Sequence, residues 1–385
     1  MLILGAIVAI AMILGTLVDV FETIVLPRRV TQRFRLTNIF FRVTWPLWRL
    51  LARKIPSRRR RENILSLYGP LALISLLGTW TVILIVGFAL IQWSLGSALV
   101  APEKHVSFGT DLYMSASTFF TLGYGDVVPN TGITRFFAVF EAGIGFGMLA
   151  LVIGYLPVLY QAFSRREANI SLLDARAGSP PSAVELLRRY AEVKGMENLA
   201  PFLAEWERWA AELLESHLSY PVLAYFRSQH ESESWIAAIV TILDASTLII
   251  LGADGGPMQQ ARHTFAMARH AVVDLSQIFV TKPRHLNSEY RLTPPDMEKM
   301  RTILDAVGVT LPDGPETEQK LLKLRRYYEP FVITLADYLL IDVPKWLHEE
   351  GSRDNWQTSS WELTATGMPI QAEKVKGYLP PSLRI

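Results

Sequence analysis

Apolar residues are concentrated in three long stretches in the first half of the chain. Only Asp19, Glu22 and Glu141 bring charge into these stretches, which cover residues 2–26, about 71–95 and about 136–160. Because about 20 apolar residues are needed to cross roughly 30 Å of hydrocarbon, each stretch predicts a transmembrane helix. A cleaved signal peptide is the alternative for the first stretch, but it has no basic start and no obvious small-residue cleavage site.

Basic residues are distributed unevenly around the three predicted spans. Residues 27–62 carry 12 basic residues and one acidic residue, whereas the connection at 98–134 holds Lys104 and leads to Arg135. Lysine and arginine are retained on the cytoplasmic side of a plasma or inner membrane, so the first loop is predicted to be cytoplasmic. The N terminus and the 98–134 connection are then outside, and everything after Ser164 is cytoplasmic.

Charge also separates the chain into two halves. Residues up to Ser164 carry 14 Lys/Arg and 7 Asp/Glu, which leaves 24 and 29 of the chain's 38 and 36 for the rest. A basic, apolar half followed by a mildly acidic half predicts a membrane part joined to a water-soluble part. The predicted segments are an N-terminal transmembrane helix, a basic cytoplasmic or interfacial linker, a helix–loop–helix unit and a helical cytoplasmic domain, at 1–26, 27–69, 70–163 and 164–385.

The linker after the first span has two distinct parts. Residues 34–52 mix aromatic residues with arginines, which is typical of a helix lying in the membrane interface, here broken near Pro46. The cluster that follows is predicted to anchor the topology near anionic lipid, or to form a specific lipid-regulatory site; it consists of Arg58, Arg59, Arg60 and Arg61. Because these arginines are contiguous and lie outside any span, they do not indicate a voltage sensor.

The connection between the second and third spans contains the candidate chemistry. Residues 110–120 are apolar but too short to cross a membrane, and Thr110 can cap a short helix with Asp111 in its first turn. The string Thr-Leu-Gly-Tyr-Gly-Asp at 121–126 follows. Its glycines open dihedrals that other residues avoid, and non-helical backbone at membrane depth must be buried in protein or face water. The carbonyl end of the short helix would point toward the membrane centre, which favours a cation.

This string resembles the selectivity filter of the potassium channel family, in the pore-only architecture of two helices around a re-entrant loop. The resemblance covers about residues 71–163 and rests on Thr121, Gly123, Tyr124, Gly125 and Asp126, then Pro129, Thr131, Arg135, Ala138, Glu141 and Gly145. It implies an all-α membrane protein that conducts K⁺ passively, and the cytoplasmic domain is then expected to assemble the tetramer or to couple a signal to the gate. It also implies no enzyme activity, no cofactor and no nucleic-acid partner. Four copies are expected, because one pore loop cannot enclose an ion.

The resemblance also assigns roles along the filter. Thr121 is expected to offer its hydroxyl and carbonyl to the innermost ion, and Tyr124 to point away from the pore. K⁺ would bind at filter carbonyls contributed by Thr121, Leu122, Gly123 and Tyr124, with Gly125 completing the filter. The expected supports of the filter are Asp126 at its outer mouth, Phe120 at its foot and Glu141 behind it.

Two residues depart from the family pattern. Leu122 stands where valine or isoleucine is usual, and Phe120 stands where threonine or serine is usual. They bear on filter rigidity and on the polarity of the cavity, and they keep a weakly selective cation channel open as an alternative. A membrane scaffold or receptor with a non-conducting pore is a further alternative.

The third span would line the inner pore. Its candidate gate hinges are Gly143, Gly145 and Gly147, with Gly154 and Pro157 as a second candidate kink. Close helix packing is an equally open reading of the glycines. Glu141 is costly in a membrane unless it pairs, either with Arg135 or within the loop's hydrogen bonds. Near the end of the first span, the three-residue spacing of Asp19 and Glu22 predicts pairing with Arg28, Arg29 or Arg33.

The C-terminal part predicts mainly helices, at 182–194, 201–217, 235–251, 257–280, 296–307 and 316–348, with a loop at 281–295 and a tail at 351–385. Residues 235–251 are apolar, but the stretch is short and has Asp244 near its centre, which predicts a buried core helix rather than a fourth span. Whether this helix touches the membrane is left open by the sequence.

Two groups of residues in the C-terminal part are candidates for binding. The aromatic stretch Glu215–Arg227 favours a packing corner over a ligand pocket. Four histidines are expected in the core or on the surface, with a metal or pH-sensing site as the alternative: His217, His230, His263 and His270. Because the chain has no cysteine, disulfides, zinc–thiolate sites and thiol catalysis are excluded.

Overall fold

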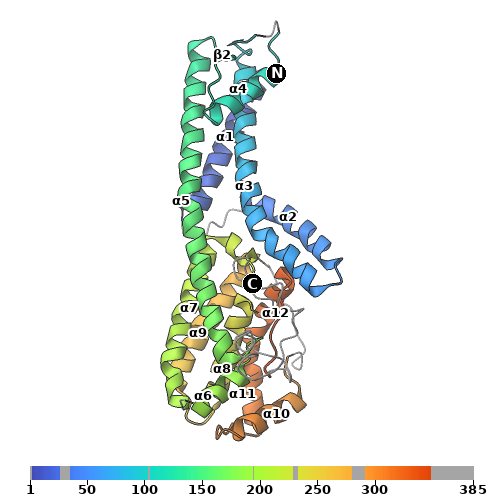
Figure 1. The fold of residues 1–385 in the computed structure, drawn as a ribbon, viewed down its shortest axis with the longest axis vertical. Coiled ribbons are helices and arrows are strands. Elements are labelled where there is room, and N and C mark those ends of the chain that lie inside the picture. The colour runs from blue at the N-terminus through green and yellow to red at the C-terminus, as the bar shows by residue number, and fades with distance from the viewer. Residues whose placement is uncertain are drawn as a thin grey trace, which may run out of the picture. The chain divides into compact units, whose positions relative to one another are not determined.

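The computed structural model of the protein describes residues 2–26, 35–102, 105–193, 195–228, 233–279 and 291–347. Its described residues fold into helices, apart from one pair of two-residue strands (Figure 1). The chain forms two compact units. The first unit contains the residues up to Arg165 together with Glu215–Arg227, and the second contains Arg166–Leu214 and the described residues from Ser228 onward. The predicted domain at 164–385 placed Glu215–Arg227 in the C-terminal part, so the structure assigns this segment differently.

Among the described residues, three helices are long and apolar enough to cross a membrane. They are α1 (Leu2–Val20, continued by the π-helical turn η1, Phe21–Val25), α3 (Arg58–Ser94) and α5 (Gly132–Ala177). These helices contain the three predicted spans, and the prediction of an all-α membrane protein is confirmed.

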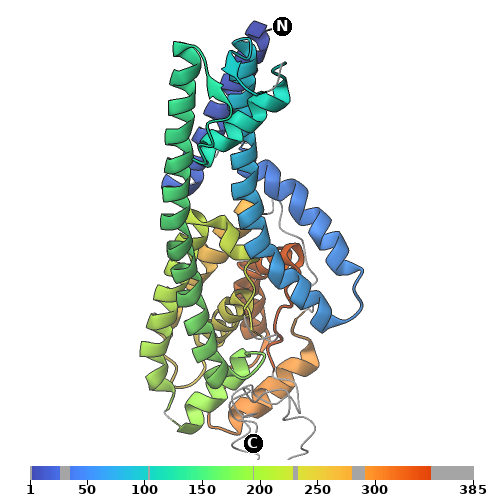
Figure 2. The same ribbon diagram turned by 45° about the horizontal axis from the view of Figure 1, so that its top comes forward.

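Helices α1 and α3 lie side by side within the first unit (Figures 1 and 2). Ala9 and Ile13 of α1 are buried in one apolar cluster with Leu84 and Phe88 of α3. A Cβ added at Gly87 would lie only 2.8 Å from Ile13 Cγ1, so the missing side chain lets the two helices approach. Small residues at such contacts favour close helix packing in membranes.

Helix α2 (Leu36–Arg53) continues through Pro46, so the predicted break there is wrong. Trp45, beside the proline, is 2% exposed and packs against Tyr68, with ring centroids 4.8 Å apart. Thr44 accompanies it with a 2.9 Å hydrogen bond to the Tyr68 hydroxyl. We attribute the continuity of the helix to this packing, which outweighs the amide hydrogen bond that proline removes.

Helix α3 begins at Arg58, with Ser57 in the N-cap position. The four clustered arginines, Arg58–Arg61, therefore form the first turn of a long helix rather than part of a separate linker. Positive side chains are not favoured by the helix dipole at an N-terminus, so the dipole does not explain this cluster.

The connection between α3 and α5 contains α4 (Phe108–Phe119), β1 (Leu99–Val100) and β2 (Val128–Pro129). The strands are antiparallel, with Leu99 opposite Pro129 and Val100 opposite Val128. The cap of α4 is Ser107, three residues before the predicted Thr110, which instead reciprocates in a capping box.

The second unit holds α6 (Ala183–Val193), η2 (Met196–Asn198), α8 (Trp235–Leu251), α9 (Met258–Phe279), α10 (Pro294–Asp305), α11 (Pro315–Arg326) and α12 (Glu329–Leu339). Helix α7 (Leu199–Ser219) begins in this unit and ends in the first, where η3 (Pro221–Tyr225) follows it. All 17 residues of α8 are buried, which confirms the predicted core helix. The single helix predicted at 316–348 is wrong, because the chain breaks at Tyr327–Tyr328 and α12 begins at Glu329, with Pro330 in its first turn.

Candidate functional site

The segment predicted to form a selectivity filter, Thr121–Asp126 (called the filter segment below), begins where α4 ends. The Leu122 amide donates to the Ser117 carbonyl at 2.8 Å and the Thr121 amide donates to the Thr118 carbonyl at 3.0 Å, which closes the helix. Beyond this point φ is +54° at Thr121, +61° at Gly123 and +78° at Gly125. Positive φ therefore recurs at every second residue from Thr121 to Gly125. The two glycines adopt this conformation without the strain that Thr121 bears.

Every residue of the filter segment is exposed in a single chain. The exposed fraction is 69% for Tyr124 and 54% for Leu122, although both side chains are large and mainly apolar. Exposed apolar groups gathered at one place mark a surface that another molecule covers.

A buried hydrogen bond lies directly behind the filter segment. Ser115 of α4 donates from Oγ to the carboxylate of Glu141 on α5, and both residues are almost fully buried. The same hydroxyl lies 2.7 Å from the Ile85 carbonyl of α3. This one serine therefore connects α4 to both flanking helices. Of the two partners predicted for Glu141, the structure shows the loop rather than Arg135, whose Nε donates to the Pro129 carbonyl.

The end of the filter segment at Asp126 has two supports. The Tyr113 hydroxyl of α4 donates to Asp126 Oδ2 at 2.9 Å. Beyond it, the β1–β2 pair and a 2.9 Å bond from the Asn130 amide to the Ala98 carbonyl tie the outgoing chain to the incoming one. The sequence reading missed Ser115 and Tyr113. Their only signal was a polar group on a short apolar helix.

The glycines of α5 differ in what surrounds them. A Cβ at Gly145 would lie 2.1 Å from the carbonyl oxygen of Phe119, the last residue of α4, so this glycine permits close packing at the foot of the filter. A Cβ at Gly143, Gly147 or Gly154 would meet nothing within 4 Å. Helix α5 runs without interruption through these positions and Pro157, and their role as gate hinges stays a prediction.

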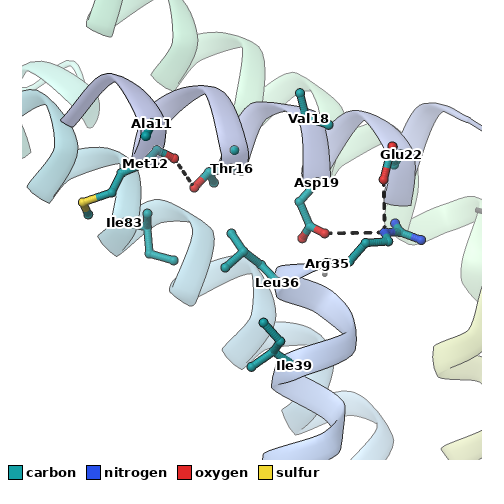
Figure 3. Close-up of a pocket in the computed structure, with 11 residues that line it drawn as sticks. Ala11, Met12, Thr16, Val18, Asp19, Glu22, Arg35, Leu36, Ile39 and Ile83 are labelled. Carbon is teal, nitrogen blue, oxygen red and sulfur yellow. Dashed lines mark hydrogen bonds and ion pairs between the residues drawn. The ribbon is translucent and has the colours of Figure 1, made fainter. Parts of the chain in front are cut away.

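A second polar site lies where α1 meets α2 and α3 (Figure 3). Asp19 is 3% exposed and its Oδ2 accepts hydrogen bonds from Trp80 Nε1 at 2.8 Å and Thr37 Oγ1 at 2.7 Å. Arg35 Nε lies 3.6 Å from Asp19 and 3.3 Å from Glu22. The predicted partners Arg28, Arg29 and Arg33 lie outside the described residues. A pocket of about 340 Å³ adjoins this cluster, which fastens three helices together.

Charged residues are buried at the centre of the second unit. Asp244 of α8 accepts from Arg291 Nη2 at 2.5 Å and from the Tyr328 hydroxyl at 2.5 Å, and Arg291 Nη1 also donates to Glu329 at 3.1 Å. Burial raises the pKa of Asp244, while Arg291 opposes the shift. Burial alone would lower the pKa of Arg291, but Asp244 raises it above its usual range. The positions and geometry indicate a structural network.

The C-terminal binding candidates resolve as follows. Glu215–Arg227 is a packing element, as predicted: Val222, Leu223 and Phe226 are buried in an apolar cluster with residues of α3 and α5. Within the described part of the chain, no three His, Asp or Glu residues come together in a way that could hold a metal. His217 is buried beside Ser216, and His270 lies at the surface near Asp274. His230 lies outside the described residues.

Comparison with known proteins agrees with this geometry. Residues 76–161, which include α4 and the filter segment, match the family described as "Ion channel". The chain is also 24% identical over 192 residues to the uncharacterised membrane protein YdjJ of Bacillus subtilis (strain 168). That alignment spans 49% of this chain and about half, 55%, of the relative. No solved structure matches the chain. The chain is therefore an all-α membrane protein whose first unit contains a region similar to ion channels.

Proposed function

We propose that the protein is a potassium-selective channel whose pore is enclosed by four copies of the chain. The observation that carries this proposal is the filter segment, where positive φ at Thr121, Gly123 and Gly125 alternates with negative φ between them. Such a backbone can present a row of carbonyls to a dehydrated cation, as it does in potassium channels. K⁺ would be held by carbonyls of residues 121–124. Ser115 and Glu141 behind the filter and Tyr113 beside Asp126 would hold its width.

The exposure of the filter segment supports the four-copy arrangement. A lone chain leaves Leu122 and Tyr124 more than half exposed, and several apolar side chains of α5 are exposed as well. Neighbouring copies would cover this surface around a common axis, which a closed rotational symmetry allows. In this arrangement α5 lines the inner pore.

The test is ion flux through purified protein in liposomes, followed by the reversal potential in a planar bilayer. The protein should carry K⁺, and its reversal potential should follow the K⁺ gradient when Na⁺ replaces K⁺ on one side. Gly123→Asp should abolish the flux, because it places a side chain and a charge on a residue with φ of +61°. Gly132→Asp, where a Cβ would meet nothing within 4 Å, is the matched control and should keep conducting.

A weakly selective cation channel is the second candidate, favoured by Phe120 and Leu122. Both side chains are more than half exposed in the single chain and would adjoin the filter in an assembly. A reversal potential that ignores the K⁺ gradient would select this candidate. Absence of any flux from correctly assembled protein would instead select the non-conducting scaffold.

The orientation and the lipid contacts are part of the same proposal. Basic residues after α1 favour a cytoplasmic position for the second unit and an external filter mouth. Arg58–Arg61 in the first turn of α3 would lie where anionic headgroups gather, and the exposed apolar residues of α2 would face the hydrocarbon edge. Protease protection of the second unit in inside-out and right-side-out vesicles tests the orientation.

A further inference from the structure

One segment of the chain leaves the second unit, packs inside the first unit and then returns. This segment, Glu215–Arg227, is called the wedge segment here. Leu214 before it and Ser228 after it both belong to the second unit. The second unit is therefore joined to the first at both ends of the wedge segment, in addition to the passage of α5 at Arg165. These attachment points are the places where the chain links the second unit to the residues that the wedge segment contacts.

The wedge segment contacts α3 through its most buried aromatic residues. The ring of Phe226 lies against Gly69 so closely that a Cβ on this glycine would be 2.7 Å from Phe226 Cδ2. The ring of Tyr225 is 5.2 Å from that of Tyr68. The wedge segment therefore lies against the part of α3 that precedes the predicted second span.

The same segment contacts α5 with its other side. The ring centroids of Tyr220 and Tyr155 are 5.6 Å apart, and those of Phe226 and Phe163 are also 5.6 Å apart. Leu159 of α5 is fully buried in the cluster that the wedge segment completes. Phe226 thus contacts both α3 and α5.

Helix α2 closes the third side. Tyr225 stacks on Phe41, with centroids 5.3 Å apart and rings 3° from parallel, and it also packs against Trp45. The 3₁₀ turn η3 holds Val222 to Tyr225 at no more than 5% exposure. A single turn of chain therefore spaces α2, α3 and α5 from one another.

The location of this contact along α5 gives it a functional meaning. Gly145 packs under the filter at Phe119, and Leu159 follows 14 positions later, which is about 21 Å along a helix. Gly154 and Pro157, the candidate kink, lie beside the wedge contacts at Tyr155 and Leu159. The wedge segment thus contacts α3 and α5 away from the filter segment. A change in the spacing of α3 and α5 at this place would open or close the conduction path.

We propose that the wedge segment couples the second unit to the gate, by setting the distance between α3 and the inner part of α5. This inference rests on the proposed channel function and adds the element through which it is regulated. A rearrangement of the second unit changes the probability that the channel is open. The filter segment is not touched, so unitary conductance and ion selectivity stay the same.

The test uses the full-length protein and two glycines of the same helix. Gly69→Ala adds a methyl group against Phe226, whereas Gly78→Ala adds one where nothing lies within 4 Å. In single-channel recordings Gly69→Ala should change the open probability at least about fivefold at unchanged conductance and reversal potential. Gly78→Ala should behave like the wild type. In a Phe226→Ala background, Gly69→Ala should change the open probability much less than it does in the wild-type background.

A second readout does not depend on conduction. The chain contains no cysteine, so Leu71→Cys and Gln161→Cys give one spin label on α3 and one on α5. With labelled protein diluted in unlabelled protein, the distance between the labels should shift in Gly69→Ala and not in Gly78→Ala. Tyr220→Leu, which removes the ring facing Tyr155, is the alternative if Gly69→Ala fails to fold.

The outcomes separate the two proposals. Equal label distances and equal open probability in Gly69→Ala and Gly78→Ala would overturn the coupling role. If Gly69→Ala shifts the label distance but the wild-type protein passes no current, the wedge segment is supported as a spacer of α3 and α5 and the channel function is rejected. A changed conductance or selectivity in Gly69→Ala would also overturn the proposal, because the wedge would then act on the filter.

Discussion

The two units differ in how much large apolar surface they leave exposed. In the first unit, large apolar residues of α5 are exposed, with Phe136 at 64%, Val139 at 74% and Phe146 at 68%. In the second unit, the charged residues Asp244 and Arg291 are buried below 10% beside an entirely buried α8. The second unit therefore completes its core within one chain. The first unit leaves apolar surface that lipid and further copies of the chain would cover.

This difference indicates where each unit is vulnerable. The first unit depends on close backbone approach, because α4 meets α5 at Gly145 and α1 meets α3 at Gly87. The second unit depends on matched charges, because an unpaired ion in its interior costs several kcal/mol. The following experiments test this contrast, in order of expected effect.

Gly145→Ala should have the largest effect. Its Cβ would lie 2.1 Å from the Phe119 carbonyl oxygen, and backbone cannot yield as a flexible side chain can. We expect loss of ion flux and of the assembled form in native mass measurements. Gly143→Ala on the same helix, where the Cβ meets nothing within 4 Å, should retain both. Wild-type flux in Gly145→Ala would show that α4 and α5 do not touch in this way.

Asp244→Leu should have the next largest effect, which is a loss of stability of the second unit. It leaves Arg291 buried without its main partner, and breaking a buried pair typically destabilises by about 3–5 kcal/mol. Hydrogen exchange should become faster in α8 and stay unchanged in α4. The double variant Asp244→Leu/Arg291→Met should recover much of the loss, since it removes both charges. Equal destabilisation of α4 would contradict the separation of the two units.

Glu141→Ala should have an intermediate effect on the first unit. It removes one of the two acceptors of the buried Ser115 hydroxyl, which keeps the Ile85 carbonyl, so the cost should lie toward the lower end of the about 1–3 kcal/mol expected for a lost buried hydrogen bond. We expect a channel that conducts briefly and loses K⁺ flux as the filter changes shape. Glu141→Gln keeps the size and a hydrogen-bonding group, so its flux should persist. Identical flux in Glu141→Ala and Glu141→Gln would show that the hydrogen bond with Ser115 does not support the filter segment.

The acid sensitivity of the second unit should be the smallest effect. Burial on its own raises the pKa of Glu185, but hydrogen bonds from Arg188 and Arg189 outweigh it and lower the pKa from 4.5 to about 2. A lowered folded-state pKa contributes stability above pH 4.5 that is lost as the pH falls toward 2. We expect Glu185→Gln to cost about 1 kcal/mol at pH 7 and nothing near pH 2, measured by chemical denaturation. A difference that persists at pH 2 would assign the effect to packing.

Local features were predictable from the sequence. The three spans follow from uninterrupted apolar length, and the short helix α4 follows from its position between two spans. The positive φ in the filter segment follows from its two glycines. Helix ends were less predictable, because Ser107 and Thr110 are both good caps and only their mutual bond decides between them. The break at Tyr327 was missed, since the apolar pattern on both sides of it continues.

The sequence by itself thus determined the class of the fold and the position of the filter segment, because both depend on neighbouring residues. Only the tertiary structure decided which distant groups meet. Asp244 and Arg291 are 47 positions apart, Ser115 and Glu141 are 26 apart, and Phe226 reaches Gly69 from a segment beyond both pore helices. No local periodicity encodes such contacts. They form where packing brings two elements together, so that a buried polar group has one available partner and a ring has one space that it can fill.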